Sequence, residues 1–192
     1  MTASGAKSAV EWLASVAPDP DACRWEWERN PLGVALLPAG RRWDVLILPG
    51  GLGRGALDVL TRLVDRPGPV LADLGEARLG FFVPPGTAAR WLGTGVRGAG
   101  RGSWIVVPYP GRATGGVHWV VAPDGSGTLT DPAVLELAMH EAAAHIAREG
   151  APVARRDAHI SREGAPVDRD AAPVARRDAH IARDGDKRGK GD

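Results

Sequence analysis

Residues 92–121 constrain the fold of this chain more than any other segment. Two apolar runs, at residues 104–107 and 117–121, flank a polar, glycine-containing connection. Both runs are rich in β-branched and aromatic residues, which are typical of half-buried strands. The prolines that follow the first run cannot donate ladder hydrogen bonds, so they belong at the end or edge of a strand. We therefore predict that the two runs form a β-hairpin.

Glycines crowd the segment in front of this predicted hairpin, at Gly93, Gly95, Gly98, Gly100 and Gly102. Such a backbone either makes tight turns or forms a surface that a ligand can approach closely. Residues 93–98 also match the glycine spacing of the dinucleotide-binding fingerprint, which requires a strand before it and a helix after it. Here a helical segment precedes it and a strand follows, so the sequence does not support a dinucleotide site.

Helix and strand signals alternate along the rest of the chain. Asp19 and Asp131 each stand before a proline, and a capping carboxylate followed by proline is a strong helix start. Apolar periodicity predicts helices at residues 8–17, 20–29, 55–64, 88–92 and 133–146, and strands at residues 33–37, 45–48, 70–74 and 79–83.

The pairing of these strands follows from the short connections between them. The first two are expected to form a hairpin or an edge pair, and the last two to pair around a Gly-Glu turn. Residues 49–53 are expected to be a flexible turn. Trp27, Cys23 and residues 81–83 are expected to be buried in the core, whereas Trp25 is expected at the surface.

These elements predict an α+β fold, with a largely antiparallel sheet and flanking helices. At 192 residues the chain allows one such domain, assigned to residues 1–148, and an appendage at residues 149–192. In the appendage a unit recurs about every 14 residues, with alternating charges and few large apolar side chains. Such units cannot bury enough surface to offset their ordering entropy, so we predict a disordered tail.

Composition excludes several classes of protein. The formal net charge of +1 gives no global basic field for nucleic acid. The single cysteine, Cys23, excludes an internal disulfide and a cysteine-cluster zinc site. No apolar run is long enough to cross a membrane, and the N-terminus lacks the pattern of a signal peptide. A cytoplasmic location without a membrane partner is therefore expected.

The glycine-rich segment and the two strands after it resemble a motif of the bifunctional DNA primase/polymerase N-terminal domain. This Prim-Pol family belongs to the archaeo-eukaryotic primase superfamily. The resemblance rests on Val96-Arg97-Gly98, on residues 103–108 and on Gly116-Val117-His118-Trp119, and extends upstream to residues 30–34 and 43–48. It covers roughly residues 20–125 and is closest to short stand-alone members from high-GC actinobacteria. It implies a primase/polymerase-like α+β fold.

The residues that carry catalysis in that family are missing here. The family has metal-binding acids where this chain has Pro49 and Gly50, a third acid where it has Gly95, and a catalytic histidine near residues 79–83. Phosphoryl transfer depends on positioning and on metal ions that neutralise the developing charge. We therefore expect no catalytic residue, no metal and no cofactor.

Three functions remain open from the sequence. The first is an inactive primase-like domain that binds nucleotide, nucleic acid or a protein partner. Its candidate contacts are arginines and aromatic residues, which can hold phosphates and stack bases: Arg97, Arg101, Arg112, Trp104, Tyr109 and Trp119. The second is an active nucleotidyltransferase that uses displaced acids such as Asp44, Asp58 or Asp73. The third is a small structural or interaction protein without a ligand.

Overall fold

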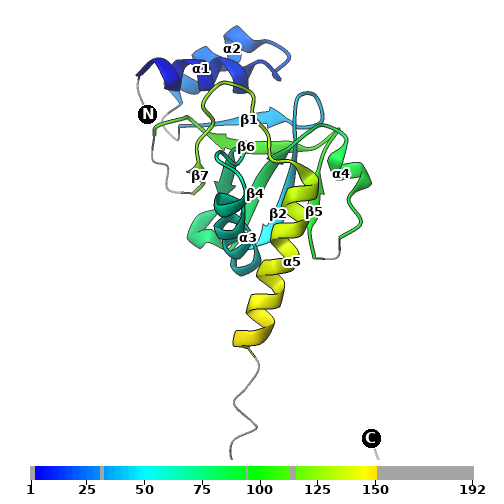
Figure 1. The fold of residues 1–192 in the computed structure, drawn as a ribbon. Coiled ribbons are helices and arrows are strands. Elements are labelled where there is room, and N and C mark those ends of the chain that lie inside the picture. The colour runs from blue at the N-terminus through cyan, green and yellow to red at the C-terminus, as the bar shows by residue number, and fades with distance from the viewer. Residues whose placement is uncertain (1–2, 31–32, 94, 113–115, 151–192) are drawn as a thin grey trace, which may run out of the picture. The chain divides into compact units, whose positions relative to one another are not determined.

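A computed structural model describes residues 3–30, 33–93, 95–112 and 116–150 of the chain (Figure 1). This part is an α+β fold with antiparallel sheets, as the sequence predicts. Its elements are α1 (Ala3–Ala14), α2 (Pro20–Arg29), β1 (Val34–Pro38), β2 (Asp44–Pro49), α3 (Gly50–Leu63), β3 (Val70–Ala72), the 3-10 turn η1 (Leu74–Glu76), β4 (Arg78–Val83), α4 (Thr87–Arg90), β5 (Arg97–Ala99), β6 (Trp104–Pro108), β7 (His118–Val121) and α5 (Pro132–Glu149). From residue 151 onward, the tail predicted to be disordered lies outside the described residues.

The main sheet of the described chain has five strands in the order β5-β2-β4-β3-β7, with every neighbour antiparallel. The predicted pairing of β3 with β4 is confirmed. The second sheet is a two-stranded ribbon in which β1 pairs with β6. We call it the β1–β6 ribbon.

Two predicted hairpins are wrong. The strands β6 and β7 do not pair with each other, because β6 joins β1 in the ribbon and β7 joins β3 at the edge of the main sheet. Likewise β1 does not pair with β2, whose neighbours are β4 and β5. Apolar alternation shows which residues face a core, but it does not choose the partner strand when distant segments compete.

The helix α3 begins at Gly50, inside the segment predicted to be a flexible turn. Its glycines disfavour a helix in isolation, but packing overrides this preference. A Cβ atom on Gly53 would lie 2.9 Å from the Cβ of Leu79, so glycine lets the helix approach β4 closely. The predicted starts of α2 and α5 are confirmed, because Asp19 and Asp131 accept hydrogen bonds from the first amides of their helices.

Two apolar clusters occupy the two faces of the main sheet. On one face Leu46, Leu48 and Phe81 are fully buried beneath α3 and α5, which lie side by side (Figure 1). On the other face Val45 and Phe82 pack with the β1–β6 ribbon, α1 and α2. Further buried members of this second cluster are Leu13, Trp27, Leu37, Trp43 and Val107.

The core predictions for Trp27 and residues 81–83 are confirmed, as is the exposure of Trp25. The prediction that Cys23 is buried is wrong, since it is only half-buried at a groove beside α2. Within the described residues, none of the helices combines the length and apolar character that crossing a bilayer requires.

Candidate functional site

Two arginines flank the end of β2 on the second face of the main sheet. In the strand register Arg97 of β5 lies opposite Ile47, and Arg78 of β4 lies opposite Pro49. Paired residues of an antiparallel sheet point to the same face, and so do residues two apart on one strand. Both arginines are therefore on the face turned away from α3 and α5.

These residues line a shallow pocket of about 360 Å³, which we call the β2-end pocket. Its wall consists of Ile47, Leu48, Pro49, Ala77, Arg78, Gly95 and Arg97. The pocket lies where the ribbon and the N-terminal helices cover this face of the sheet incompletely. Val45 is 1% exposed under the second cluster, whereas Ile47, two residues on, is only partly covered.

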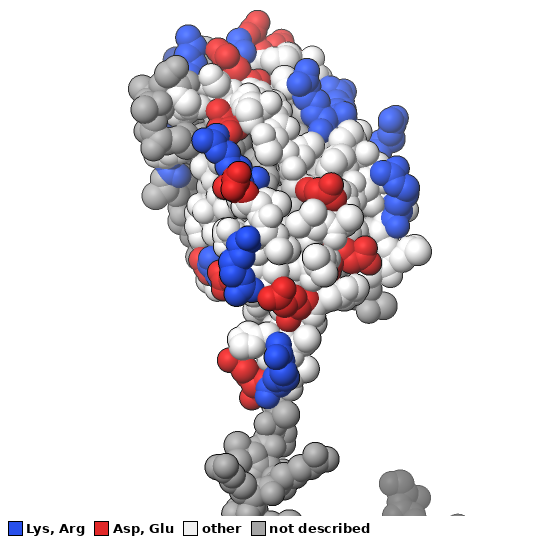
Figure 2. Space-filling view, in the orientation of Figure 1, with Lys and Arg blue, Asp and Glu red and all other residues white. Residues whose placement is uncertain are grey.

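The β2-end pocket is electropositive. Arg78 and Arg97 are exposed, and within the described residues neither guanidinium forms an ion pair. None of the described residues that line the pocket carries a carboxylate. Gly95 adopts a φ of 78°, and a Cβ atom there would meet nothing within 4 Å, so the backbone at the rim is open to a ligand. Figure 2 shows basic side chains toward the side where α4 and β5 lie, and mixed charges elsewhere on that view.

A polar cluster stands at the turn that leads into Arg78. Glu76 forms an ion pair with Arg54 of α3, and its Oε1 lies 3.4 Å from Nε2 of His118 of β7. Glu76 is the one non-glycine residue with positive φ, at 55°, in the described chain. That conformation costs a non-glycine residue energy, and the contacts with Arg54 and His118 hold the side chain in place. The cluster fixes the turn and thereby the start of β4.

Of the two arginines of the pocket, Arg97 is among the contacts predicted from the sequence, and Arg78 is not. Arg97 stands out by its neighbouring glycines, whereas Arg78 follows an ordinary Gly-Glu turn. The signal that could have found it is the pairing of β4 with both β2 and β3, which brings the first residue of β4 to Pro49.

The other two predicted arginines lie elsewhere. Arg101 is exposed in the turn after β5. Its backbone packs closely on Gly40, because a Cβ atom on Gly40 would lie 2.4 Å from the Cα of Arg101. Trp104 is exposed nearby, opposite Pro38 at the end of the ribbon. Arg112 is at the other end of the ribbon, where its guanidinium lies 4.5 Å from the ring centre of Tyr109 and donates to the carbonyl of Glu28 at 3.2 Å.

Two of the predicted aromatic residues make internal contacts. The ring of Tyr109 meets Trp27 edge-on, with centroids 5.6 Å apart. Trp119 packs on Phe82 at 5.5 Å and donates from Nε1 to the carbonyl of Pro108 at 2.9 Å. The six predicted contacts thus lie in several places, and of them only Arg97 lines the β2-end pocket.

The three displaced acids also lie apart. Asp44 is 1% exposed at the start of β2, the end opposite the pocket, and its Oδ2 accepts from the amide of Ala88 at 2.9 Å. Asp58 is exposed on α3, and Asp73 accepts from the backbone amide of Arg78. Across the described ranges, no three histidine, cysteine or acidic side chains gather closely enough to hold a metal ion.

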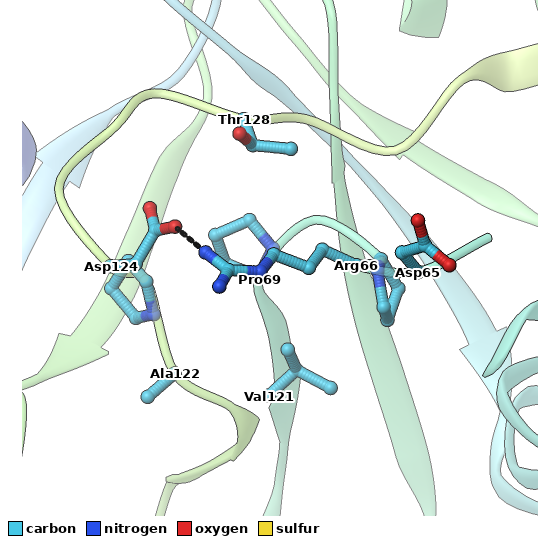
Figure 3. A pocket seen from close by; sticks show the side chains of 9 residues that line it. Asp65, Arg66, Pro69, Val121, Ala122, Asp124 and Thr128 are labelled. Atoms are coloured by element: carbon cyan, nitrogen blue, oxygen red, sulfur yellow. Dashed lines mark ion pairs between the residues drawn. The ribbon is translucent and has the colours of Figure 1, made fainter. Parts of the chain in front are cut away.

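A second pocket, of about 270 Å³, lies between the loop before β3 and the loop after β7 (Figure 3). Arg66 points across it to Asp124, with 3.7 Å between the guanidinium and the carboxylate. Hydrogen bonds from the hydroxyl and amide of Ser126, helped by Arg66, lower the pKa of Asp124. Because this arginine is already paired, the pocket is less suited to an anion than the β2-end pocket.

Comparison with known proteins finds no matching family model, no matching curated protein and no matching solved structure. The resemblance to Prim-Pol domains therefore stays a prediction from the sequence motifs.

Proposed function

We propose that this chain is a primase/polymerase-like domain without catalytic activity, which binds the phosphates of a nucleotide or of single-stranded nucleic acid at the β2-end pocket. The observation that carries the proposal is the pair of arginines, Arg78 and Arg97, on either side of the strand end. In the resembled family this position holds metal-binding acids. If the resemblance holds, two cations lie near the positions at which that family has a cluster of anions.

The chemistry of the pocket suits a phosphate. A guanidinium presents a planar fork of donors that matches phosphate oxygens, and two of them can share one phosphate or bridge two. The open backbone around Gly95 allows amide donors to approach the same anion. Because the pocket is shallow and solvent-exposed, we expect weak binding that falls with added salt.

The test is a titration of ATP and of a labelled single-stranded oligonucleotide at two salt concentrations. Arg78→Ala and Arg97→Ala should each weaken binding about tenfold, or ~1.4 kcal/mol, because each removes a charge-assisted contact. Each should also flatten the salt dependence of oligonucleotide binding by about one counterion. Arg62→Ala is the matched control, since Arg62 is an exposed arginine of α3 that is paired with Glu141. Binding that ignores both pocket arginines would reject the proposal.

The same preparation should not extend a primer with magnesium or manganese, because the acids within the described residues do not gather into a metal-binding group. Nucleotide incorporation that disappears in Asp44→Ala would favour the active-enzyme alternative instead.

A comparison of ATP with the oligonucleotide separates the two ligand classes. Because Arg101 and Arg112 do not line the pocket, loss of either should leave ATP binding unchanged, and an effect on the oligonucleotide would show that it contacts the protein beyond the pocket.

An interaction protein without a small ligand is the second candidate function. It is favoured by exposed apolar side chains that line the outer face of the β1–β6 ribbon. Leu36 and Val106 are direct cross-strand neighbours and are 58% and 44% exposed, and Trp104 beside them is 53% exposed. Contiguous exposed apolar surface of this kind is typical of protein contacts.

A further inference from the structure

A groove of about 440 Å³ runs between α2 and the outer edge of β1, on the part of the molecule formed by α1, α2 and the ribbon. From α2 it is lined by Ala22, Cys23 and Glu26, and from β1 by Val34 and Leu36. It is larger than the β2-end pocket and than the pocket of Figure 3. It has no part in the proposed phosphate site.

The edge of β1 that faces this groove has unpaired backbone groups. Hydrogen bonds from Tyr109 to Gly33 and from Ala39 to Ser103 show that the odd-numbered residues of this strand bond to β6. The even-numbered residues direct their amide and carbonyl groups the other way. The carbonyl of Val34 accepts from the side chain of Asn30 at 2.8 Å, but the amide and carbonyl of Leu36 have no partner among the described residues.

The lining of the groove combines apolar side chains with two acidic ones. Asp19 and Glu26 line it, and none of its described lining residues is basic. Burial, and then the nearby Glu26, raise the pKa of the Cys23 thiol, so this side chain presents a neutral, apolar surface at neutral pH. A sheet edge with free donors and acceptors beside such a groove is suited to an added strand.

We propose that the edge of β1 binds an extended peptide as an additional strand, with an apolar side chain in the groove and a basic side chain next to Glu26. The amide and carbonyl of Leu36 provide the backbone contacts, and the α2 side of the groove selects the side chains. Acidic peptides are excluded because Asp19 and Glu26 repel them. The added strand widens the ribbon to three strands and continues its exposed apolar face.

The test measures binding of a labelled eight-residue peptide of alternating valine and lysine to the full chain by fluorescence polarisation. A peptide of alternating valine and glutamate, and the lysine peptide N-methylated at alternate amides, serve as probes of charge and of strand pairing. The lysine peptide should bind, and both other peptides should fail. On binding, the Leu36 amide should show slower hydrogen exchange.

Glu26→Lys is the decisive variant, because Glu26 is exposed and its replacement should leave the fold intact. It should weaken the lysine peptide about fivefold, the upper range for an exposed ion pair, and allow the glutamate peptide to bind. Glu28→Lys is the matched control on the same helix, since Glu28 does not line the groove. No binding of the lysine peptide, equal binding of the N-methylated peptide, or equal effects of the two variants would overturn the proposal. Arg78→Ala should leave peptide binding unchanged, which separates this result from the phosphate test.

Discussion

The two faces of the main sheet differ in how completely they are covered. On the first face Leu46 and Leu48 are both fully buried, because α3 and α5 cover β2 along its length. On the second face Val45 is buried, but Ile47 is only partly covered by the cluster that the ribbon and the N-terminal helices form. These β2 residues are apolar on both faces. The β2-end pocket lies on the second face, where Ile47 is only partly covered.

The largest effect is expected on the closed face. Leu135 of α5 is fully buried there, and Leu135→Ala should lower the free energy of unfolding by 2–5 kcal/mol through lost burial and a cavity. Leu137, two residues on, is 56% exposed, and Leu137→Ala should change stability by less than about 0.5 kcal/mol. Urea denaturation of both variants measures this contrast. Equal effects would mean that α5 does not cover the sheet as described.

A medium effect is expected where the covered part of the second face meets the ribbon. Trp119→Phe keeps an aromatic ring near Phe82 but removes the hydrogen bond to the Pro108 carbonyl, so it should cost about 1 kcal/mol. Trp104→Phe is the control, because Trp104 is exposed on the outer face of the ribbon. If Trp119→Phe left thermal stability unchanged but abolished phosphate binding, Trp119 would be a ligand contact and not a structural one.

The smallest effect concerns Asp124, at the pocket of Figure 3. Its folded-state pKa is lowered from the ordinary value of 3.8 by hydrogen bonds from Ser126. A carboxyl with a lowered pKa stabilises the fold above its unfolded-state pKa, and loses that contribution as the pH falls through the folded value. Asp124→Asn should therefore cost well under 1 kcal/mol at pH 7, since the group is half-exposed.

This cost should shrink as the pH falls below about 3.8. Urea denaturation at pH 7, 5 and 3.5 follows it. Ser126→Ala is the companion variant, because it removes the hydroxyl donor and leaves the carboxylate in place. A cost that grows toward low pH would contradict a lowered pKa of Asp124 in the folded protein.

Local signals in the sequence predicted the local structure well. The helix starts at Asp19 and Asp131 and the β3–β4 pair depend on neighbouring residues, and all three are confirmed. The partners of β1 and β6 lie far apart in the sequence, and no local pattern specifies such pairing. The helical start of α3 depends on the contact of Gly53 with Leu79, which is also long-range.

In the candidate site, too, the local features could be predicted from the sequence and the long-range ones could not. Arg97 could be singled out from the glycines around it, but its partner Arg78 is defined only by the register of three strands. Tyr109 and Trp119 carry the sequence signature of base-stacking residues, yet their rings contact Trp27 and Phe82 inside the protein. Composition cannot distinguish an aromatic residue that faces a ligand from one that joins two sheets.

The most direct test of the central claim is a map of backbone amide shifts by NMR as ATP is added to the labelled protein at low salt. The largest shifts should cluster at Ile47, Ala77, Arg78, Gly95 and Arg97, and the double variant Arg78→Ala/Arg97→Ala should lose them. Amides on α5 should not move. Shifts centred on the Arg66–Asp124 pocket, or no shifts up to millimolar ATP, would contradict a phosphate site at the end of β2.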